Sequence, residues 1–136
     1  MGNYTDPGLQ EKEKFLRDVN KAYSEGDEKF FMEHISDDIC WTIVGEKDIA
    51  GKAEFKEVLD QMKEMPAVEI QVDNVLVHHT HGVVEGVVIS RNRLGQKKHF
   101  GFCDIYKFAE GKELRITAIN SYVIDISRHL QYREKC

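Results

Sequence analysis

The spacing of apolar residues predicts three helices in the first half of the chain. Apolar positions recur at helical spacing between a start near Pro7 and an end near Gly26. Asp27 can cap a second, shorter helix with a narrow apolar face. A third helix follows the glycine-containing loop 45–51 and ends before Pro66, because proline cannot continue a helix.

Aromatic and β-branched residues dominate the remaining segments, which is typical of β-strands. One such segment separates the second helix from the third, and four longer segments follow the third helix. The five predicted strands cover residues 38–45, 68–79, 82–92, 98–108 and 113–126. The order α-α-β-α-β-β-β-β predicts a single α+β domain over residues 1–136, in which helices cover one face of a curved antiparallel sheet.

The composition is typical of one globular domain. Of the 136 residues, 41% are hydrophobic and 32% are charged. The net charge of −5 and the scattered basic residues argue against nucleic-acid binding. No apolar run reaches the roughly 20 residues that span a bilayer, and the N-terminal residues lack the features of a signal peptide. Three cysteines without a CxxC motif fit a reducing compartment, so we expect a cytoplasmic protein that does not bind membranes.

Three stretches of the sequence resemble one known superfamily. They are "YSEGDEKFFMEHISDDICWTIVG", "IAGKAEF" and "DIYKFAEGKELRITAINSYVID". Over about residues 9–126 the chain is similar to nuclear transport factor 2-like proteins, and more narrowly to the small SnoaL-like and ketosteroid-isomerase-like members. The resemblance implies a cystatin-like cone, with the sheet wrapped around three N-terminal helices and an internal pocket, and commonly a dimer. Isomerases, cyclases, dehydratases, epoxide hydrolases and non-catalytic proteins share this fold, so it does not select one activity.

The resemblance implies a role for one residue that matches a functional residue of the family. Asp104 in "DIYKF" matches the aspartic acid that ketosteroid isomerases use as a protonated hydrogen-bond donor to an oxyanion. The positions of the family's catalytic tyrosine and general-base aspartate hold Val19 and Ile43 instead. Steroid isomerisation is therefore not expected. Nor does the sequence supply a clear Asp-Arg-Asp set of the kind that epoxide hydrolases of this fold need.

Asp104 is also the acidic exception in the aromatic strand "FGFCDIYKF". Strand alternation places Phe102 and Tyr106 on the same face as Asp104, and on the inner face this carboxyl would lie in an aromatic cage. Desolvation would then raise its pKa, which suits a hydrogen-bond donor or a general base. A two-residue turn at 94–95 would place Glu85 opposite Asp104, whereas a slip of one residue would turn Glu85 to the outer face. A structural carboxyl with hydroxyl and amide partners is the alternative.

The remaining candidates would surround Asp104 in the pocket. Glu85 and His34 are its expected proton-transfer partners. Seven residues are predicted to contact the ligand: Tyr23, Trp41, Phe55, Phe102, Tyr106, Asn120 and Tyr122. Core packing is the alternative for the aromatic members, and a surface position is the alternative for His34. We expect no cofactor and no metal, because the "HHTH" run at 78–81 lacks a third ligand.

The last predicted strand indicates an interface. Its even-numbered residues over 114–122 are assigned to the inner face and its odd-numbered residues to the outer face. Ile119 and Val123, beside Ile105 of the preceding strand, would make this outer face too apolar for water. The pattern predicts a homodimer that packs through the outer face of the sheet.

These inferences predict a protein that binds a small apolar or aromatic, partly oxygenated molecule. Such a protein could be a cofactor-independent isomerase, cyclase or dehydratase in which Asp104 transfers a proton or stabilises an oxyanion. The alternative is a non-catalytic module, either a ligand-binding protein or a dimeric scaffold.

Overall fold

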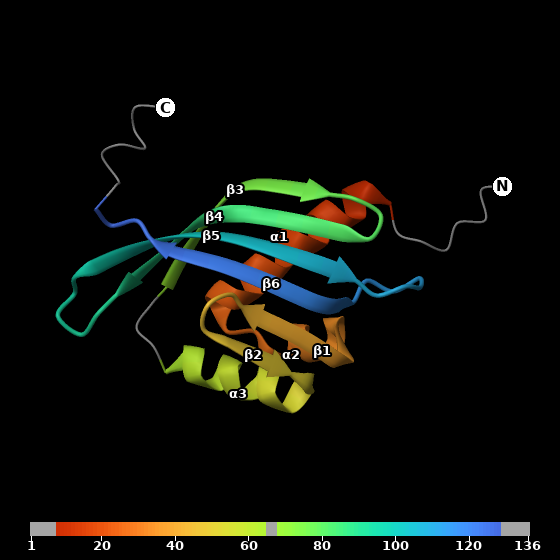
Figure 1. Cartoon of the computed structure of the whole chain (residues 1–136), viewed down its shortest axis with the longest axis horizontal. Coiled ribbons are helices and arrows are strands. Elements are labelled where there is room, and N and C mark those ends of the chain that lie inside the picture. Colours follow the sequence, from red (N-terminus) through yellow and green to blue (C-terminus); the bar gives the residue numbers. More distant parts are fainter. Residues whose placement is uncertain (1–7, 65–67, 129–136) are drawn as a thin grey trace.

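The computed structural model describes residues 8–64 and 68–128, which form helices packed against a twisted sheet (Figure 1). The helices are α1 (Leu9–Glu25), α2 (Glu28–His34) and α3 (Gly51–Lys63). The strands are β1 (Ile35–Ile43), β2 (Lys47–Ala50), β3 (Val68–Val77), β4 (His81–Arg91), β5 (Lys97–Phe108) and β6 (Ile116–Asp125). The predicted α+β class is confirmed. The expected helix start at Pro7 and the stop at Pro66 lie outside the described residues.

The strands form one open, mixed sheet in the order β2-β1-β6-β5-β4-β3. Every neighbouring pair is antiparallel except β1 and β6, which run parallel. An entirely antiparallel sheet was therefore a wrong expectation. No short connection joins β1 to β6, so hairpin geometry does not fix their relative direction. The short edge strand β2 was expected to be loop, and its pairing with β1 is what makes it a strand.

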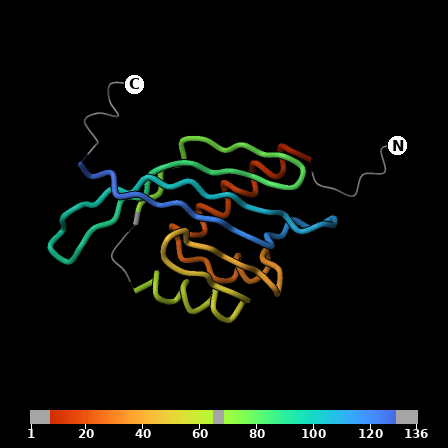
Figure 2. Tube along the Cα trace, in the orientation of Figure 1, coloured from red at the N-terminus to blue at the C-terminus, as the bar shows by residue number. Residues whose placement is uncertain are grey.

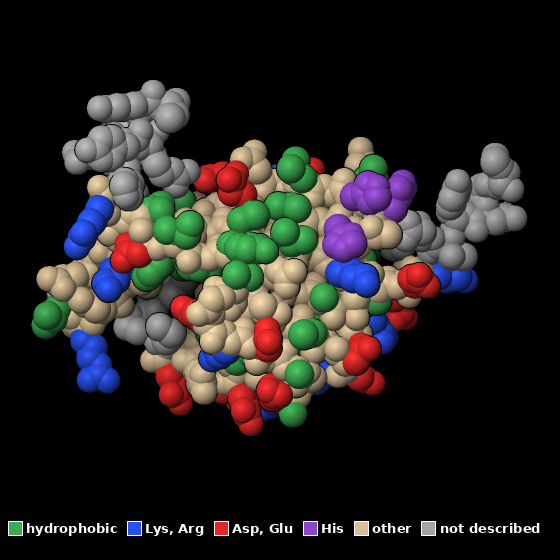
Figure 3. Space-filling view, in the orientation of Figure 1, with side chains coloured by type: hydrophobic (Ala, Val, Ile, Leu, Met, Phe, Trp, Pro, Cys, Tyr) green, Lys and Arg blue, Asp and Glu red, His purple; other side chains and the backbone are tan. Residues whose placement is uncertain are grey.

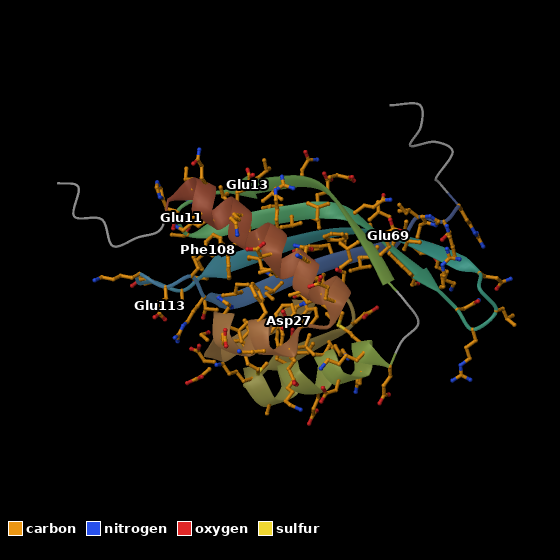
Figure 4. All side chains as sticks on the ribbon, turned by 180° about the vertical axis from the view of Figure 1, so that it is seen from behind. Glu11, Glu13, Asp27, Glu69, Phe108 and Glu113 are labelled. Carbon is orange, nitrogen blue, oxygen red and sulfur yellow. The ribbon has the colours of Figure 1, made fainter. Side chains whose placement is uncertain are left out.

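The helices cover one face of the sheet and form the core with it. Seen from behind, α1 runs across β3 to β6, while α2 and α3 lie against the β1 end (Figure 4). Gly26 ends α1 in the left-handed conformation at φ 66°, where the Cβ of another residue would be strained. The Asp27 carboxylate then caps α2 by accepting the Phe30 N–H at 3.1 Å. Both helix boundaries agree with the sequence prediction.

The β4–β5 hairpin projects beyond the rest of the sheet (Figure 2) and corrects the expected register. The Asn92 side chain accepts the N–H groups of Leu94 and Gln96, each at 2.9 Å, and Gly95 has a φ of 79°. The Asn92 backbone N–H donates to the Gln96 carbonyl at 3.0 Å, so this bond encloses the three-residue loop 93–95 instead of the expected two-residue turn.

The longer loop shifts the whole pairing by one position. Asp104 lies opposite Val84, and Glu85 lies opposite Cys103 on the outer face. The expected pair of Glu85 with Asp104 was therefore wrong. The Glu85 carboxylate instead accepts the Asn74 side-chain N–H at 2.8 Å.

A β-bulge in β6 reverses the expected inner and outer faces of that strand. Phe108 pairs with Ile116 and Lys107 pairs with Ala118, so Thr117 is the extra residue. The side chains beyond the bulge consequently change face. Ile119 and Ser121 are buried, whereas Asn120 and Tyr122 are exposed, so their assignment to the inner face was wrong.

The outer face of the sheet carries apolar side chains that no helix covers. Figure 3 shows a hydrophobic group at the centre of this face. Val83, Cys103 and Ile105 are half-buried there, and Tyr122 is 45% exposed. Separately, none of the described helices is long and apolar enough to cross a membrane.

Candidate functional site

A cavity of about 670 Å³ lies between the inner face of the sheet and helices α1 and α3. Its walls are mostly apolar. The lining side chains of Asn20, Asp104 and Ser121 are buried and define its inner end, whereas those of Glu25, Glu46 and Lys47 are exposed and define its mouth. Ile43, Met62, Ile70 and Val88 are among the apolar side chains of the wall. A concave, mainly apolar space with a few polar groups is typical of a small-molecule site.

Asp104 is the buried carboxylate of this cavity. Its position on β5 between Phe102 and Tyr106 directs it inward, as the strand alternation predicted, and it is only 9% exposed. The Tyr106 hydroxyl donates to Asp104 Oδ2 at 3.3 Å. Burial raises the pKa of Asp104 to about 6, while hydrogen bonds from Ser121 and Tyr106 oppose the shift. Asp104 can therefore exchange a proton near neutral pH.

Ser121 connects Asp104 to Trp41. The Trp41 Nε1–H donates to Ser121 Oγ at 2.9 Å, and the same hydroxyl hydrogen-bonds Asp104. The β5–β6 pairing sets this geometry because Ser121 lies directly opposite Asp104. Sequence reasoning missed Ser121, since the bulge at Thr117 that turns it inward has no sequence signal comparable to a glycine turn. Trp41 lines the cavity as predicted.

Tyr23 brings an unsatisfied hydroxyl to the cavity. This hydroxyl is buried and has no hydrogen-bond partner within ordinary distance among the described residues, although the Tyr106 hydroxyl lies near it. Burial raises the pKa of Tyr23 and the negative charge of Asp104 adds to the shift, while a weak interaction with the Tyr106 hydroxyl opposes it. Because a buried hydroxyl without a partner is costly, a ligand oxygen that accepted its hydrogen would relieve that cost.

The structure brings five of the predicted site residues together and separates others. Tyr23, Trp41, Phe102 and Asp104 line the cavity, and Tyr106 bonds Asp104 from behind it. Phe55 is fully buried, and its ring lies 5.6 Å from Phe31 and 5.2 Å from Trp41, measured between ring centroids. It therefore supports Trp41 from the core instead of lining the cavity.

His34 does not reach the cavity. Its Nδ1–H donates to the Phe30 carbonyl at 2.7 Å, and its ring stacks on that of Phe30 at 4.3 Å. The Phe15 ring also lies close, 5.5 Å from the His34 ring between centroids. The C-terminal turn of α2 thus holds His34 beside the helix, and its expected approach to Asp104 was wrong. Together with the outward position of Glu85, this leaves Asp104 without a second acid or base among the described residues of the cavity's inner end.

The structure also places Val19 and Ile43, the two residues that stand where steroid isomerases have their catalytic tyrosine and aspartate. Val19 is a fully buried residue of α1, and Ile43 lines the cavity. Tyr23 lies one helical turn after Val19 and so projects from the same side of α1. A phenol is therefore present in the cavity, but it comes from a different position of the helix.

Comparisons with known proteins agree with this fold. The family model of the SnoaL-like domain matches residues 16–116. The structure of an NTF2-like protein of unknown function from Cytophaga hutchinsonii is 28% identical, with a TM-score of 0.64 over 82% of this chain and 98% of that chain. No curated protein sequence matches the chain significantly.

Two more distant structures show the same fold in enzymes. An LEH-like epoxide hydrolase from M. tuberculosis is 18% identical, with a TM-score of 0.74 over 87% of this chain and 86% of that chain. SalBIII is an epoxide hydrolase/cyclase-like enzyme with a role in pyran ring formation in salinomycin. It is 14% identical, with a TM-score of 0.76 over 89% of this chain and 95% of that chain. Since the SnoaL-like model covers most of the chain, this protein belongs to the SnoaL-like family, with the NTF2-like fold.

Proposed function

We propose that the protein binds an apolar, oxygen-bearing small molecule in the cavity and transfers a proton to or from it through Asp104. The observation that carries this proposal is the buried carboxyl at the inner end of an apolar cavity, with a pKa raised to about 6. At pH 7 such a group is mostly ionised yet still a much stronger base than an exposed aspartate. Isomerisation, cyclisation and dehydration all need a proton transfer of this kind.

Tyr23 supplies the complementary hydrogen-bond donor. In the proposed step, the Asp104 carboxylate removes a proton from a carbon next to a carbonyl group, and the Tyr23 hydroxyl donates to the oxygen on which negative charge develops. The protonated carboxyl then returns the proton to the substrate. The Tyr23 hydroxyl supports this role because it is buried and no described residue lies within 3.5 Å of it as a hydrogen-bond partner.

A second candidate is binding without catalysis. The described residues at the inner end of the cavity place no other acid or base beside Asp104, since Glu85 and His34 lie elsewhere. A binding protein would need only the apolar wall and the hydrogen bonds of Tyr23 and Asp104.

One experiment separates these candidates. Trp41 is the only tryptophan of the chain and lines the cavity, so its emission reports ligand binding. We expect decan-2-one to bind about tenfold more tightly than the hydrocarbon dec-1-ene, and Tyr23→Phe to remove this preference. Tyr122→Phe, on the outer face, is the matched control and should keep it. Equal binding of the ketone and the hydrocarbon by the wild type would contradict the proposal.

Catalysis is tested with the same ketone in D₂O. The wild type should exchange the hydrogens next to the carbonyl for deuterium faster than Asp104→Asn, as measured by mass spectrometry. Binding of the ketone with no exchange above that of the variant would favour the non-catalytic candidate.

We further propose that two copies of the chain pack through the outer sheet face. The half-buried Val83, Cys103 and Ile105 support this arrangement, because a sheet face in water is usually more polar. A second copy would present the same apolar strip and cover it symmetrically.

A further inference from the structure

A second hollow, of about 610 Å³, lies where the β4–β5 hairpin meets the chain after β6. Lys97, Lys98 and Arg128 line it, with Asp125 as the single carboxylate. Its other lining side chains are neutral and polar, from Asn92, Gln96 and Ser127. Basic side chains are visible along the projecting hairpin in Figure 3. A hollow with an excess of positive charge is unusual on a chain whose net charge is −5.

This hollow adjoins the ligand cavity along the strands. Ser90 and Phe100 line the cavity, and Lys98 lies opposite Ser90 and two residues before Phe100. Asp125 lies opposite Phe100. Because alternate residues of a strand share a face, Lys98 and Asp125 continue the cavity face of the sheet into the hollow.

The positive charge of the hollow is available to a ligand. Among the described residues, neither Lys97, Lys98 nor Arg128 forms an ion pair within 4 Å, whereas Lys63 at the cavity mouth lies 3.9 Å from Glu28. The Asp125 carboxylate accepts the Ser127 N–H at 2.9 Å. Beside the hydrogen bonds from Ser127, the charges of Lys98 and Arg128 help to lower the pKa of Asp125, so this one carboxylate offsets part of the positive charge, and an excess of two basic side chains is left in the hollow. Apart from Asp104, the charged residues that line the cavity are equal in number, with Lys47 and Lys63 against Glu25 and Glu46.

We propose that the ligand is an elongated amphiphile whose anionic end, a carboxylate or a phosphate, binds to Lys98 and Arg128 in the hollow. Its apolar body then fills the cavity, and its oxygenated far end reaches Asp104. The six residue steps from Lys98 to Asp104 span about 20 Å of strand, which sets the scale of such a molecule. This inference rests on the proposed function, because it assigns the other end of the same ligand.

The test compares three probes of one chain length through the emission of Trp41. Decanoate and decyl phosphate carry the two anionic groups, and decan-1-ol is the neutral control. At low salt we expect at least one anion to bind about tenfold more tightly than the alcohol, and 0.5 M NaCl to remove most of this difference. The stronger of the two anions identifies the end group.

Variants locate the anion. Lys98→Gln with Arg128→Gln should weaken binding of the preferred anion about fivefold or more and leave decan-1-ol unchanged. The matched control, Arg17→Gln with Lys29→Gln, removes the same charge from the helices. It should change neither the binding of the preferred anion nor the binding of decan-1-ol. The assignment to the hollow is overturned if Lys47→Gln with Lys63→Gln weakens binding of the preferred anion while Lys98→Gln with Arg128→Gln does not.

The two proposals fail in different ways. If decan-1-ol binds as tightly as both anions, the inferred anionic end group is wrong, while the proposed cavity function stands. If none of the three probes binds, the proposed binding function fails together with this inference.

Discussion

At the scale of single residues, the chemistry of the protein depends on the environment of Asp104. The same carboxyl on the outer face would be solvated, but on the inner face it is 9% exposed and surrounded by aromatic side chains. Tyr106 and Ser121 satisfy part of its hydrogen-bonding capacity, yet they do not cancel the cost of burial, so its pKa is raised to about 6. The protein thus holds a carboxyl in a state that is unfavourable for folding at neutral pH.

This cost predicts how stability depends on pH. The pKa of Asp104 is about 6 in the folded protein, against 3.8 as its ordinary value, so the folded state binds the proton more tightly. Stability should therefore fall as the pH rises through the range from about 4 to 6. Between pH 5 and pH 8, we expect the wild type to lose about 1–2 kcal/mol of unfolding free energy relative to Asp104→Asn, measured by urea denaturation.

The control for this experiment is Asp18→Asn, which removes an exposed carboxylate of α1. The unfolding free energy of this variant should depend on pH as that of the wild type does. Parallel profiles of the wild type and Asp104→Asn would show that the environment of Asp104 does not raise its pKa.

At the scale of elements, two local irregularities decide which residues reach the cavity. The three-residue loop of the β4–β5 hairpin turns Glu85 outward, and the bulge at Thr117 turns Ser121 inward. Each irregularity shifts the alternation of inward and outward side chains by one residue. Such a shift exchanges the two faces of the strand. The composition of the site is therefore set by turns and bulges as much as by the strands themselves.

These irregularities also explain what the sequence could predict. Periodicity identified the helices, the long strands and the inward position of Asp104, because those depend on local patterns of apolar residues. It could not place Asn120, Tyr122 and Ser121, since the bulge before them is fixed by pairing with β5 and β1. It also missed the edge strand β2, whose four residues carry too little pattern. The turn at Gly26 and the cap at Asp27 were predictable because each is a local backbone requirement.

The hairpin loop provides a prediction at this scale. Asn92→Ala removes the side-chain oxygen that accepts two backbone N–H groups, and we expect it to lower the unfolding free energy by about 1–2 kcal/mol. Gln96→Ala is the matched control, because it removes only the side-chain bond from Asn92 and keeps the backbone donor. Thermal denaturation of both variants measures the difference, and an equal effect of the two would contradict the role given to Asn92.

At the scale of the whole molecule, the sheet separates two surfaces with different roles. Its inner face, with the helices, encloses the cavity, and its outer face carries the apolar strip that we propose to be the contact between two copies. Cys103 and Asp104 are neighbours in sequence but lie on opposite faces. A dimer of this kind would therefore stabilise the sheet from behind without covering the mouth of the cavity.

Sedimentation tests this arrangement. The wild type should sediment at about twice the chain mass of 15.7 kDa across a concentration series, and Ile105→Lys should shift it to the monomer, because the new charge would lie within the contact. Leu94→Lys, at the exposed tip of the hairpin, is the control and should leave the mass unchanged. A monomeric wild type at all concentrations would rule the contact out.

The central claim is that Asp104 is a buried carboxyl poised for proton exchange. Its most direct test is a ¹³C NMR titration of the Asp104 carboxyl carbon in protein labelled at aspartate, with Asp104→Asn used to assign the signal. The structure predicts a midpoint at about pH 6. A midpoint near the ordinary value of 3.8 would contradict the claim and remove the basis for placing acid–base chemistry in this cavity.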